Sequence, residues 1–170
     1  ESAERTVQVG FDGYAVGGLS VGETRSEMLD SLDGVTACLP SDQPRYFMGL
    51  GDPVGLVEVV ARGIDMFDCV LPTRHARHGT VLTTGGRLNL RNARFATDDQ
   101  PLDPEFPASP AHRWSRAYLR HLLLTDEPTG PRLLTLHNLA WLLDFVARLR
   151  AAILDGRFGE FRAETLAVWS

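Results

Sequence analysis

Cysteine is scarce in this 170-residue chain, which has only Cys38 and Cys69. Two cysteines exclude the disulfide framework of a small secreted domain. Each lies in or beside an apolar run, which is typical of a reduced, buried thiol in a cytoplasmic protein. No run of about 18 apolar residues exists, so no membrane-spanning helix is predicted, and residues 1–5 do not have the pattern of a signal peptide. With 44% hydrophobic residues, the chain can build a packed domain without disulfides.

Lysine is absent, and all seventeen basic residues are arginine. A GC-rich genome would account for this, although the sequence itself gives no reason. The net charge of -5 excludes a generally basic nucleic-acid-binding domain. Residues 69–97 nevertheless contain five arginines and no acid, whereas residues 1–68 contain twelve acids and four arginines. This basic stretch is either a surface that contacts phosphates or the solvated face of a hairpin.

The first part of the chain alternates between strands and helices. Apolar runs predict strands at residues 8–16, 45–50 and 64–71, and residues 23–32 predict a helix with acids in its first turn. A second helix begins at Asp52-Pro53, with Asp as N-cap and Pro at the first helical position, and ends at Gly63. This order is typical of a parallel α/β sheet, in which ligands bind at the carboxyl ends of the strands.

The pattern changes after Pro72. Short strands at residues 80–84 and 87–91 flank Gly85-Gly86 and predict a hairpin. Residues 98–111 are rich in Pro and Asp and predict an ordered loop. Helices are expected at residues 109–124, 138–154 and 158–169. Because three parallel strands cannot close a barrel, and residues 1–6 look like the end of a helix, we expect the chain to start inside a larger domain.

Asp68 is the first candidate for chemistry. It lies near the end of the apolar strand at residues 64–71, where a carboxylate directed into a cleft could act as nucleophile or base. The alternative is a structural Asp that caps a neighbouring loop, a role that is also expected of Asp65 at the start of the strand. Gly17-Gly18, after the first strand, either let a ligand approach the backbone or form only a tight turn. Their spacing is not that of a dinucleotide-binding glycine motif.

Two further groups of side chains have a suggestive spacing. Arg74 and Arg77, just past the third strand, can grip phosphates or stack on bases, or they lie in a solvated loop. Trp114, Tyr118 and His121 recur at helical spacing, which predicts one helix face that is buried within the chain or against a second subunit.

Seven segments together resemble bacterial tRNA-guanine transglycosylases, the queuine tRNA-ribosyltransferase family. They occur in the family's order and at its spacing across nearly the whole chain. The segments read FDGYAVGGLSVGE at residues 11–23, PRYFMG at 44–49, GIDMFDCVLPTR at 63–74, NLRNA at 89–93, PLDPE at 101–105, SRAYL at 115–119 and LTLHN at 134–138. No single segment is decisive, but the ordered series is highly specific.

The resemblance implies the C-terminal half of a (β/α)8 barrel enzyme. Residues 1–79 would form the last barrel strands with the nucleophile. Residues 80–137 would form an inserted hairpin and a subdomain, and residues 138–170 C-terminal helices that pack on the barrel. The implied activity exchanges guanine at the tRNA wobble position for a 7-deazaguanine in the cytoplasm, with tRNA, both bases, the N-terminal half and a second copy as partners.

The resemblance also implies a role for each candidate residue. Asp68 matches the nucleophile, whose carboxylate attacks the ribose anomeric carbon and forms a covalent ribosyl-enzyme, much as in retaining glycosidases. The implied positions for base reading are Gly17, Gly18, Leu19 and Met48. Positions that hold the anticodon loop match Arg74 and Arg77, and an aromatic patch of the homodimer interface matches Trp114, Tyr118 and His121.

The chain departs from the family at its zinc site. The family binds zinc through a Cys-x-Cys-x-x-Cys segment and a later His, but the cysteine positions here are Phe106, Ala108 and Ala111, and only His137 remains. One imidazole cannot hold structural zinc, which takes four ligands, so we predict no metal and no other cofactor. A lone His beside an apolar run is expected to be a hydrogen-bonded core residue.

A second departure leaves the function open at this stage. The family's acid/base Asp and a base-reading Gln belong to earlier strands, which this chain does not contain. The alternatives to an active transglycosylase are a non-catalytic subunit that binds tRNA or stabilises a partner, and a divergent transglycosylase that acts on another nucleic acid or sugar.

Overall fold

The computed structural model describes residues 1–19 and 21–170; Ser20, in the first segment of the resemblance, lies outside the described residues. The chain divides into two compact units, Glu1–Val70 and Leu71–Ser170. No helix in the described residues is long and apolar enough to cross a membrane.

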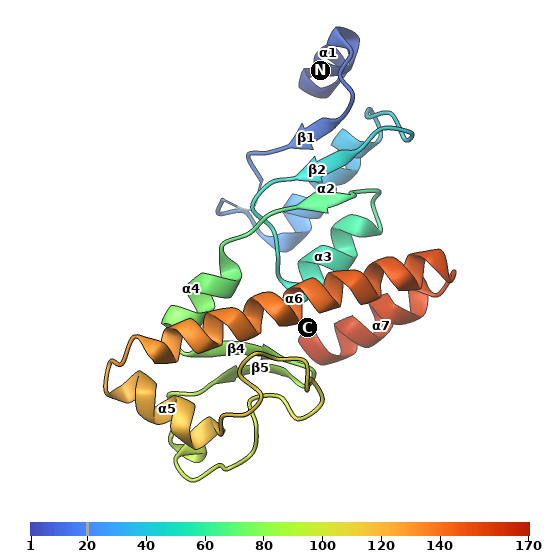
Figure 1. Cartoon of the computed structure of the whole chain (residues 1–170). Helices are drawn as coiled ribbons and strands as arrows, with labels where there is room; N and C mark the ends of the chain where they lie inside the picture. The colour runs from blue at the N-terminus through green and yellow to red at the C-terminus, as the bar shows by residue number, and fades with distance from the viewer. Residues whose placement is uncertain (20) are drawn as a thin grey trace. The chain divides into compact units, whose positions relative to one another are not determined.

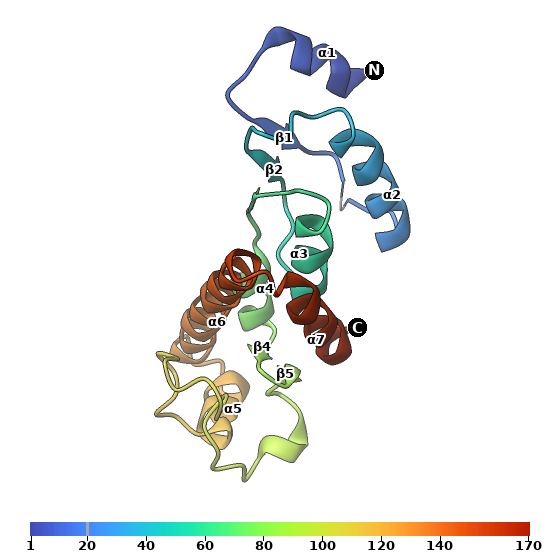
Figure 2. The same cartoon turned by 90° about the vertical axis from the view of Figure 1, so that its right-hand side faces the viewer.

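The first unit is a three-stranded parallel sheet with helices, in the strand order β1-β2-β3. Figure 2 shows α2 and α3 on the same side of the sheet. The α/β class expected from the sequence is therefore confirmed, and the arrangement is consistent with part of a (β/α)8 barrel. Its elements are α1 (Ser2–Val9), β1 (Tyr14–Val16), α2 (Arg25–Thr36), β2 (Arg45–Phe47), α3 (Pro53–Val60) and β3 (Met66–Phe67).

Local side-chain bonds explain where the helices of this unit begin. Thr24 and Glu27 form a capping box at the start of α2, in which each side chain accepts the other's backbone N–H. The side chain of Asp52 accepts the N–H of Gly55, and Pro53 is the first residue of α3, as predicted. Arg25 pairs with Asp52 at 2.8 Å and thereby joins the first turns of the two helices.

The strand boundaries needed correction. The strand expected at residues 8–16 begins only at Tyr14, because Gln8 and Val9 complete α1. The strand expected at residues 64–71 is paired only at Met66 and Phe67. The helix expected at residues 23–32 begins two residues later, at Arg25, and continues to Thr36. An apolar run in the sequence indicates which residues are buried. The bounds of a strand depend instead on which residues pair with a neighbouring strand.

The second unit is built around the long helix α6 (Thr129–Leu154), which contacts α4, β4, α5 and α7. The antiparallel pair β4 (Thr80–Thr83) and β5 (Gly86–Asn89) lies beside α6 in Figure 1. The other elements are α4 (Leu71–Arg77), η1 (Ala93–Phe95), α5 (Arg116–Leu124) and α7 (Phe158–Trp169). The hairpin and the helix at residues 158–169 are confirmed.

Several predicted boundaries in this unit were wrong for identifiable reasons. The solvated loop considered as the alternative for Arg74 and Arg77 is instead the helix α4, since proline is tolerated in a first helical turn. The helix expected at residues 138–154 already begins at Thr129, with Pro131 in its first turn. The helix expected at residues 109–124 begins at Arg116, where Ser115 accepts the N–H of Tyr118. The hairpin turn is Thr84-Gly85 rather than Gly85-Gly86.

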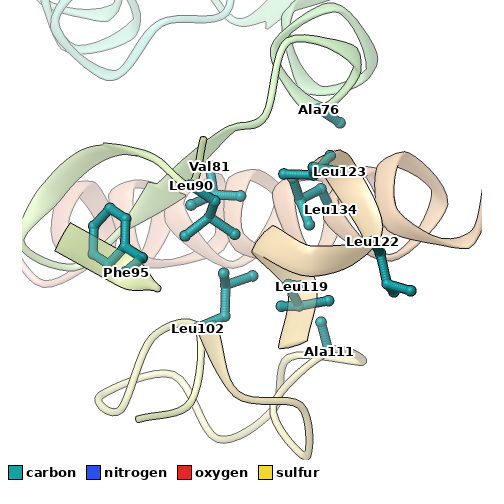
Figure 3. Packing of buried hydrophobic residues seen from close by; sticks show 10 residues of the cluster. All are labelled: Ala76, Val81, Leu90, Phe95, Leu102, Ala111, Leu119, Leu122, Leu123 and Leu134. Carbon is teal, nitrogen blue, oxygen red and sulfur yellow. The ribbon is translucent and has the colours of Figure 1, made fainter. Parts of the chain in front are cut away.

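The hydrophobic core of the second unit is formed by side chains of α4, β4, η1, α5, α6 and the segments between them (Figure 3). Asn138, fully buried on α6, ties α4 and β4 to this helix through its amide. Its Nδ2 donates to the carbonyls of Pro72 and Thr80 at 3.1 Å each, and its Oδ1 accepts the N–H of Leu82 at 2.9 Å. The cluster consists of Ala76, Val81, Leu90, Phe95, Leu102, Ala111, Leu119, Leu122, Leu123 and Leu134.

Candidate active site

The candidate residues of the first unit meet at the carboxyl ends of its three strands. Val16 of β1 is in register with Phe47 of β2, and Phe47 with Phe67 of β3. Continuing this register by one residue aligns Gly17, Met48 and Asp68 in a single row across the sheet. The backbone N–H of Met48 donates to the carbonyl of Val16 at 3.0 Å, which extends the pairing of β1 and β2 toward this row. The structure thus brings together residues that are far apart in the sequence.

Asp68 is an exposed carboxylate held in place by two hydrogen bonds. The hydroxyl of Tyr46 donates to its Oδ1 at 2.6 Å, and the backbone N–H of Gly49 donates to the same oxygen at 2.9 Å. Both bonds stabilise the charged form, so the pKa of Asp68 lies below its ordinary value, with the Tyr46 hydroxyl as the largest cause. The same bond raises the pKa of Tyr46. Asp68 is therefore ionised at neutral pH, and its Oδ2 is the oxygen oriented by neither bond.

Gly17 and Met48, the other two residues of the row, lie in close contact with each other. A Cβ at Gly17 would lie 2.9 Å from Sδ of Met48, so only glycine fits without displacing the thioether. Gly18 has a φ of +77°, a conformation that favours glycine as well. The side chain of Met48 is 47% exposed, and Leu19 is half-buried against the apolar core of the unit. Exposed backbone beside an exposed thioether is a surface on which a flat ring can lie.

Tyr46 was missed as a candidate residue, although the pattern contained the signal for it. It stands two residues before Met48 in the strand that was expected at residues 45–50, and side chains at that spacing lie on the same face of a sheet. The observed strand β2 ends earlier, at Phe47. Asp65, by contrast, has the structural position that was expected. Its Oδ2 accepts the N–H of Arg45 at 2.9 Å, at the opposite end of the paired segment.

The remaining candidates belong to the second unit. Arg74 and Arg77 are both exposed, three residues apart on α4 rather than in a loop. Trp114 precedes α5, and its ring lies 5.1 Å from that of Tyr118. The prediction that these aromatic residues form a buried helix face within the chain was wrong, because Tyr118 is 42% exposed and His121 is exposed. The buried face of α5 is instead formed by Leu119, Leu122 and Leu123.

Comparison with known proteins identifies the family. The sequence profile described as queuine tRNA-ribosyltransferase matches residues 1–170. The chain belongs to this family. Among proteins named queuine tRNA-ribosyltransferase, that of Caulobacter vibrioides is 52% identical over 167 residues, which are 98% of this chain and 45% of the relative. That of Solidesulfovibrio magneticus is 52% identical over 169 residues, 99% of this chain and 45% of the relative. That of Halothermothrix orenii is 51% identical over 166 residues, 98% of this chain and 44% of the relative.

The chain spans about half the length of the curated family members it matches. Their name describes a glycosyltransferase, an enzyme that transfers a ribosyl group, with tRNA as the substrate. The match extends from the strand ends of the first unit through the helices of the second, so the family resemblance covers every candidate residue.

The positions that correspond to the family's zinc ligands do not fit a metal. Phe106, Ala108 and Ala111 carry no ligand atom, and both ring nitrogens of His137 are engaged in hydrogen bonds with protein groups. Within the described residues, no group of three His, Cys, Asp or Glu side chains could hold a metal ion. His137 is fully buried, and this burial lowers its pKa, so the ring is neutral.

Proposed function

We propose that this chain carries the nucleophile and part of the base pocket of a tRNA-guanine transglycosylase acting in the cytoplasm. The observation that supports this most strongly is the row of Gly17, Met48 and Asp68, in which an ionised carboxylate stands beside exposed backbone and an exposed thioether. Family membership supplies the reaction class, since the relatives are named as tRNA-ribosyltransferases.

In the proposed reaction, Oδ2 of Asp68 forms a bond to the anomeric carbon of the wobble ribose. The bond from that carbon to guanine breaks, and guanine leaves with the bonding electron pair. The 7-deazaguanine nitrogen then attacks the same carbon and releases Asp68 as a carboxylate. The proton lost by the incoming base balances the proton gained by guanine. Tyr46 and Gly49 hold Oδ1 throughout and leave the other oxygen to react.

The chain's share of the pocket is the floor beneath the base. Gly17, Gly18 and Leu19 present backbone groups, and Met48 packs on the face of the ring. We propose that the rest of the barrel completes the pocket and pairs with the two outer strands, β1 and β3. Met66 of β3 is 54% exposed, which supports a further neighbour for that strand.

Contacts beyond the pocket are proposed for two groups of residues in the second unit. Arg74 and Arg77 would bind phosphates of the anticodon loop, since guanidinium groups spaced three residues apart lie on one helix face. Trp114, Tyr118 and His121 would form an aromatic patch in a homodimer interface. The ring of Trp114 also lies 4.4 Å beneath the guanidinium of Arg113, so this surface combines aromatic area with positive charge.

The deciding experiment is incorporation of labelled guanine into tRNA by the chain joined to a complementary N-terminal half. We expect incorporation that Asp68→Ala abolishes while tRNA binding is kept, and that Asp42→Ala, at another exposed Asp, leaves unchanged. Exchange retained by Asp68→Ala would contradict the nucleophile assignment. Binding of tRNA without any exchange by the unaltered protein would instead support a non-catalytic subunit.

A further inference from the structure

The segment that corresponds to the family's cysteine motif is closely packed in this chain. Phe106 and Ala111 are buried, while Ala108 is exposed. Ala111 belongs to the apolar core together with Leu119 and Leu122, and the ring of Phe106 meets that of His137 edge-on at 6.0 Å (Figure 3 shows Ala111 in this core). Two of the three cysteine positions have therefore become part of the hydrophobic core, where a metal would need polar ligand atoms.

Ser109, between the second and third of these positions, makes the polar contacts. Its Oγ lies 2.7 Å from Nδ1 of His137 and accepts the N–H of Ala111 at 3.1 Å. The other ring nitrogen of His137, Nε2, lies 2.7 Å from the carbonyl oxygen of Leu82 on β4. A carbonyl can only accept, so Nε2 carries the hydrogen and Nδ1 accepts the proton of the Ser109 hydroxyl. We call this chain of hydrogen bonds, from Ser109 through His137 to Leu82, the relay. Each side-chain polar atom in it has a hydrogen-bond partner.

The relay joins three separate parts of the second unit. Ser109 lies in the loop before α5, His137 on α6 and Leu82 on β4. Consecutive backbone bonds brace the loop itself: Ser109 donates to Phe106, His112 to Ser109 and Trp114 to Ala111. A bound metal would fix the same loop to the same helix through its ligands. The serine–histidine pair makes that connection with one short hydrogen bond in a fully buried place.

We propose that Ser109 has taken over the structural task of the metal, so that the Ser109–His137–Leu82 relay and the packed Phe106 and Ala111 hold this subdomain without zinc. The inference concerns folding rather than catalysis and does not depend on the proposed transglycosylase activity. In this proposal, the attachment of the loop to α6 depends on the hydroxyl of Ser109. Ser109 is not at a zinc-ligand position, so a comparison of those positions alone would not identify it.

The test uses the whole chain, purified without a metal-binding tag from medium containing zinc. We expect metal analysis to find far less than one zinc per chain, and a strong chelator to leave the unfolding temperature unchanged. Ser109→Ala should lower that temperature by about 3–10 °C, because it leaves buried groups without a partner. Ser26→Ala, at an exposed serine on α2, is the control and should have little effect. Stoichiometric zinc, or unfolding by the chelator, would overturn the proposal.

Nitrogen NMR of the His137 ring gives a readout that does not require any variant to fold. The relay predicts a neutral ring with its hydrogen on Nε2. The opposite tautomer, or a ring whose nitrogen shifts change on addition of a chelator, would contradict the assignment of Ser109 as the donor.

Discussion

The hydroxyl of Tyr46 lies 2.6 Å from Oδ1 of Asp68, so a side chain of β2 holds the carboxylate that follows β3. The bond stabilises the ionised carboxylate and is the largest cause of the lowered pKa of Asp68. Because the carboxylate is already exposed, this bond gives it a fixed orientation rather than shelter from water. A nucleophile must be both charged and aimed, and this pair supplies both conditions.

Tyr46→Phe removes that bond, so we expect the pKa of Asp68 to rise toward its ordinary value. Since the reactive form is the carboxylate, the acid limb of the exchange rate should move to higher pH. Loss of orientation should also lower kcat, by about 10- to 100-fold. Carboxyl-carbon NMR titration of the chain measures the pKa, and guanine exchange by the joined halves measures the rate. Tyr118→Phe is the matched control for the titration, and an unchanged Asp68 titration in Tyr46→Phe would refute the argument.

Gly17→Ala tests the floor of the proposed base pocket. The added Cβ would lie 2.9 Å from Sδ of Met48, so the thioether must move from the surface on which the base would lie. We expect the KM for the base to rise by about tenfold, with a smaller effect on kcat, since ground-state and transition-state binding are weakened together. Gly34→Ala is the control, because a Cβ there meets nothing within 4 Å. Equal effects of the two substitutions on KM would show that Met48 does not contact the base.

The order of elements and the strand-end location of the site followed from the sequence alone. Alternating apolar runs predicted the parallel sheet, and the N-cap at Asp52 fixed the start of α3. The helix ends at Val60, three residues before the Gly63 that was expected to stop it. Asp68 and Gly17 were assigned to strand ends, and the register then aligned them with Met48. These features are local or periodic, and periodic patterns survive when the exact pairing is unknown.

The features that the sequence did not predict depend on contacts between distant residues. The Tyr46–Asp68 bond needs the register of two strands, and the Ser109–His137 bond joins residues that are 28 positions apart. The start of α6 at Thr129 was missed because Gly130 and Pro131 are typical of a loop, although both are tolerated in a first helical turn. Single-residue propensities cannot show which side chain will find a buried partner across the fold.

Arg74→Ala combined with Arg77→Ala should weaken tRNA binding and reduce its dependence on salt. If each guanidinium neutralises one phosphate of a single-stranded loop, the slope of log affinity against log salt should fall by about 1.4 in magnitude. Binding measured at several salt concentrations tests this expectation. Arg150→Ala with Arg157→Ala removes the same charge at other exposed sites of the unit and is the control. A slope equal to that of the control pair would mean that α4 does not contact phosphates.

Trp114→Ala combined with Tyr118→Ala should disrupt the proposed homodimer of the joined protein. The two ring centroids lie 5.1 Å apart in a tilted arrangement, with Tyr118 42% exposed and Trp114 partly buried. Aromatic side chains at a surface are typical of the residues that dominate interfaces. Sedimentation equilibrium should show a dissociation constant raised by at least about 30-fold, which corresponds to about 2 kcal/mol. Leu143→Ala, at a leucine of α6 that is 70% exposed, is the control. A dimer unaffected by the double substitution would place the interface elsewhere.

Asn138→Ala tests whether one buried amide organises the second unit. The substitution leaves the N–H of Leu82 and the carbonyl of Pro72, both buried, and the part-buried carbonyl of Thr80 without their partner. We expect the free energy of unfolding to fall by about 2–4 kcal/mol, because several buried polar groups lose their hydrogen bonds at once. Asn89→Ala, at an exposed asparagine whose side chain accepts the nearby N–H of Arg91, should cost less than about 1 kcal/mol. Urea unfolding compares the two variants. Similar losses of stability in the two variants would mean that the packing of α6 against α4 and β4, rather than the Asn138 amide, holds these elements together.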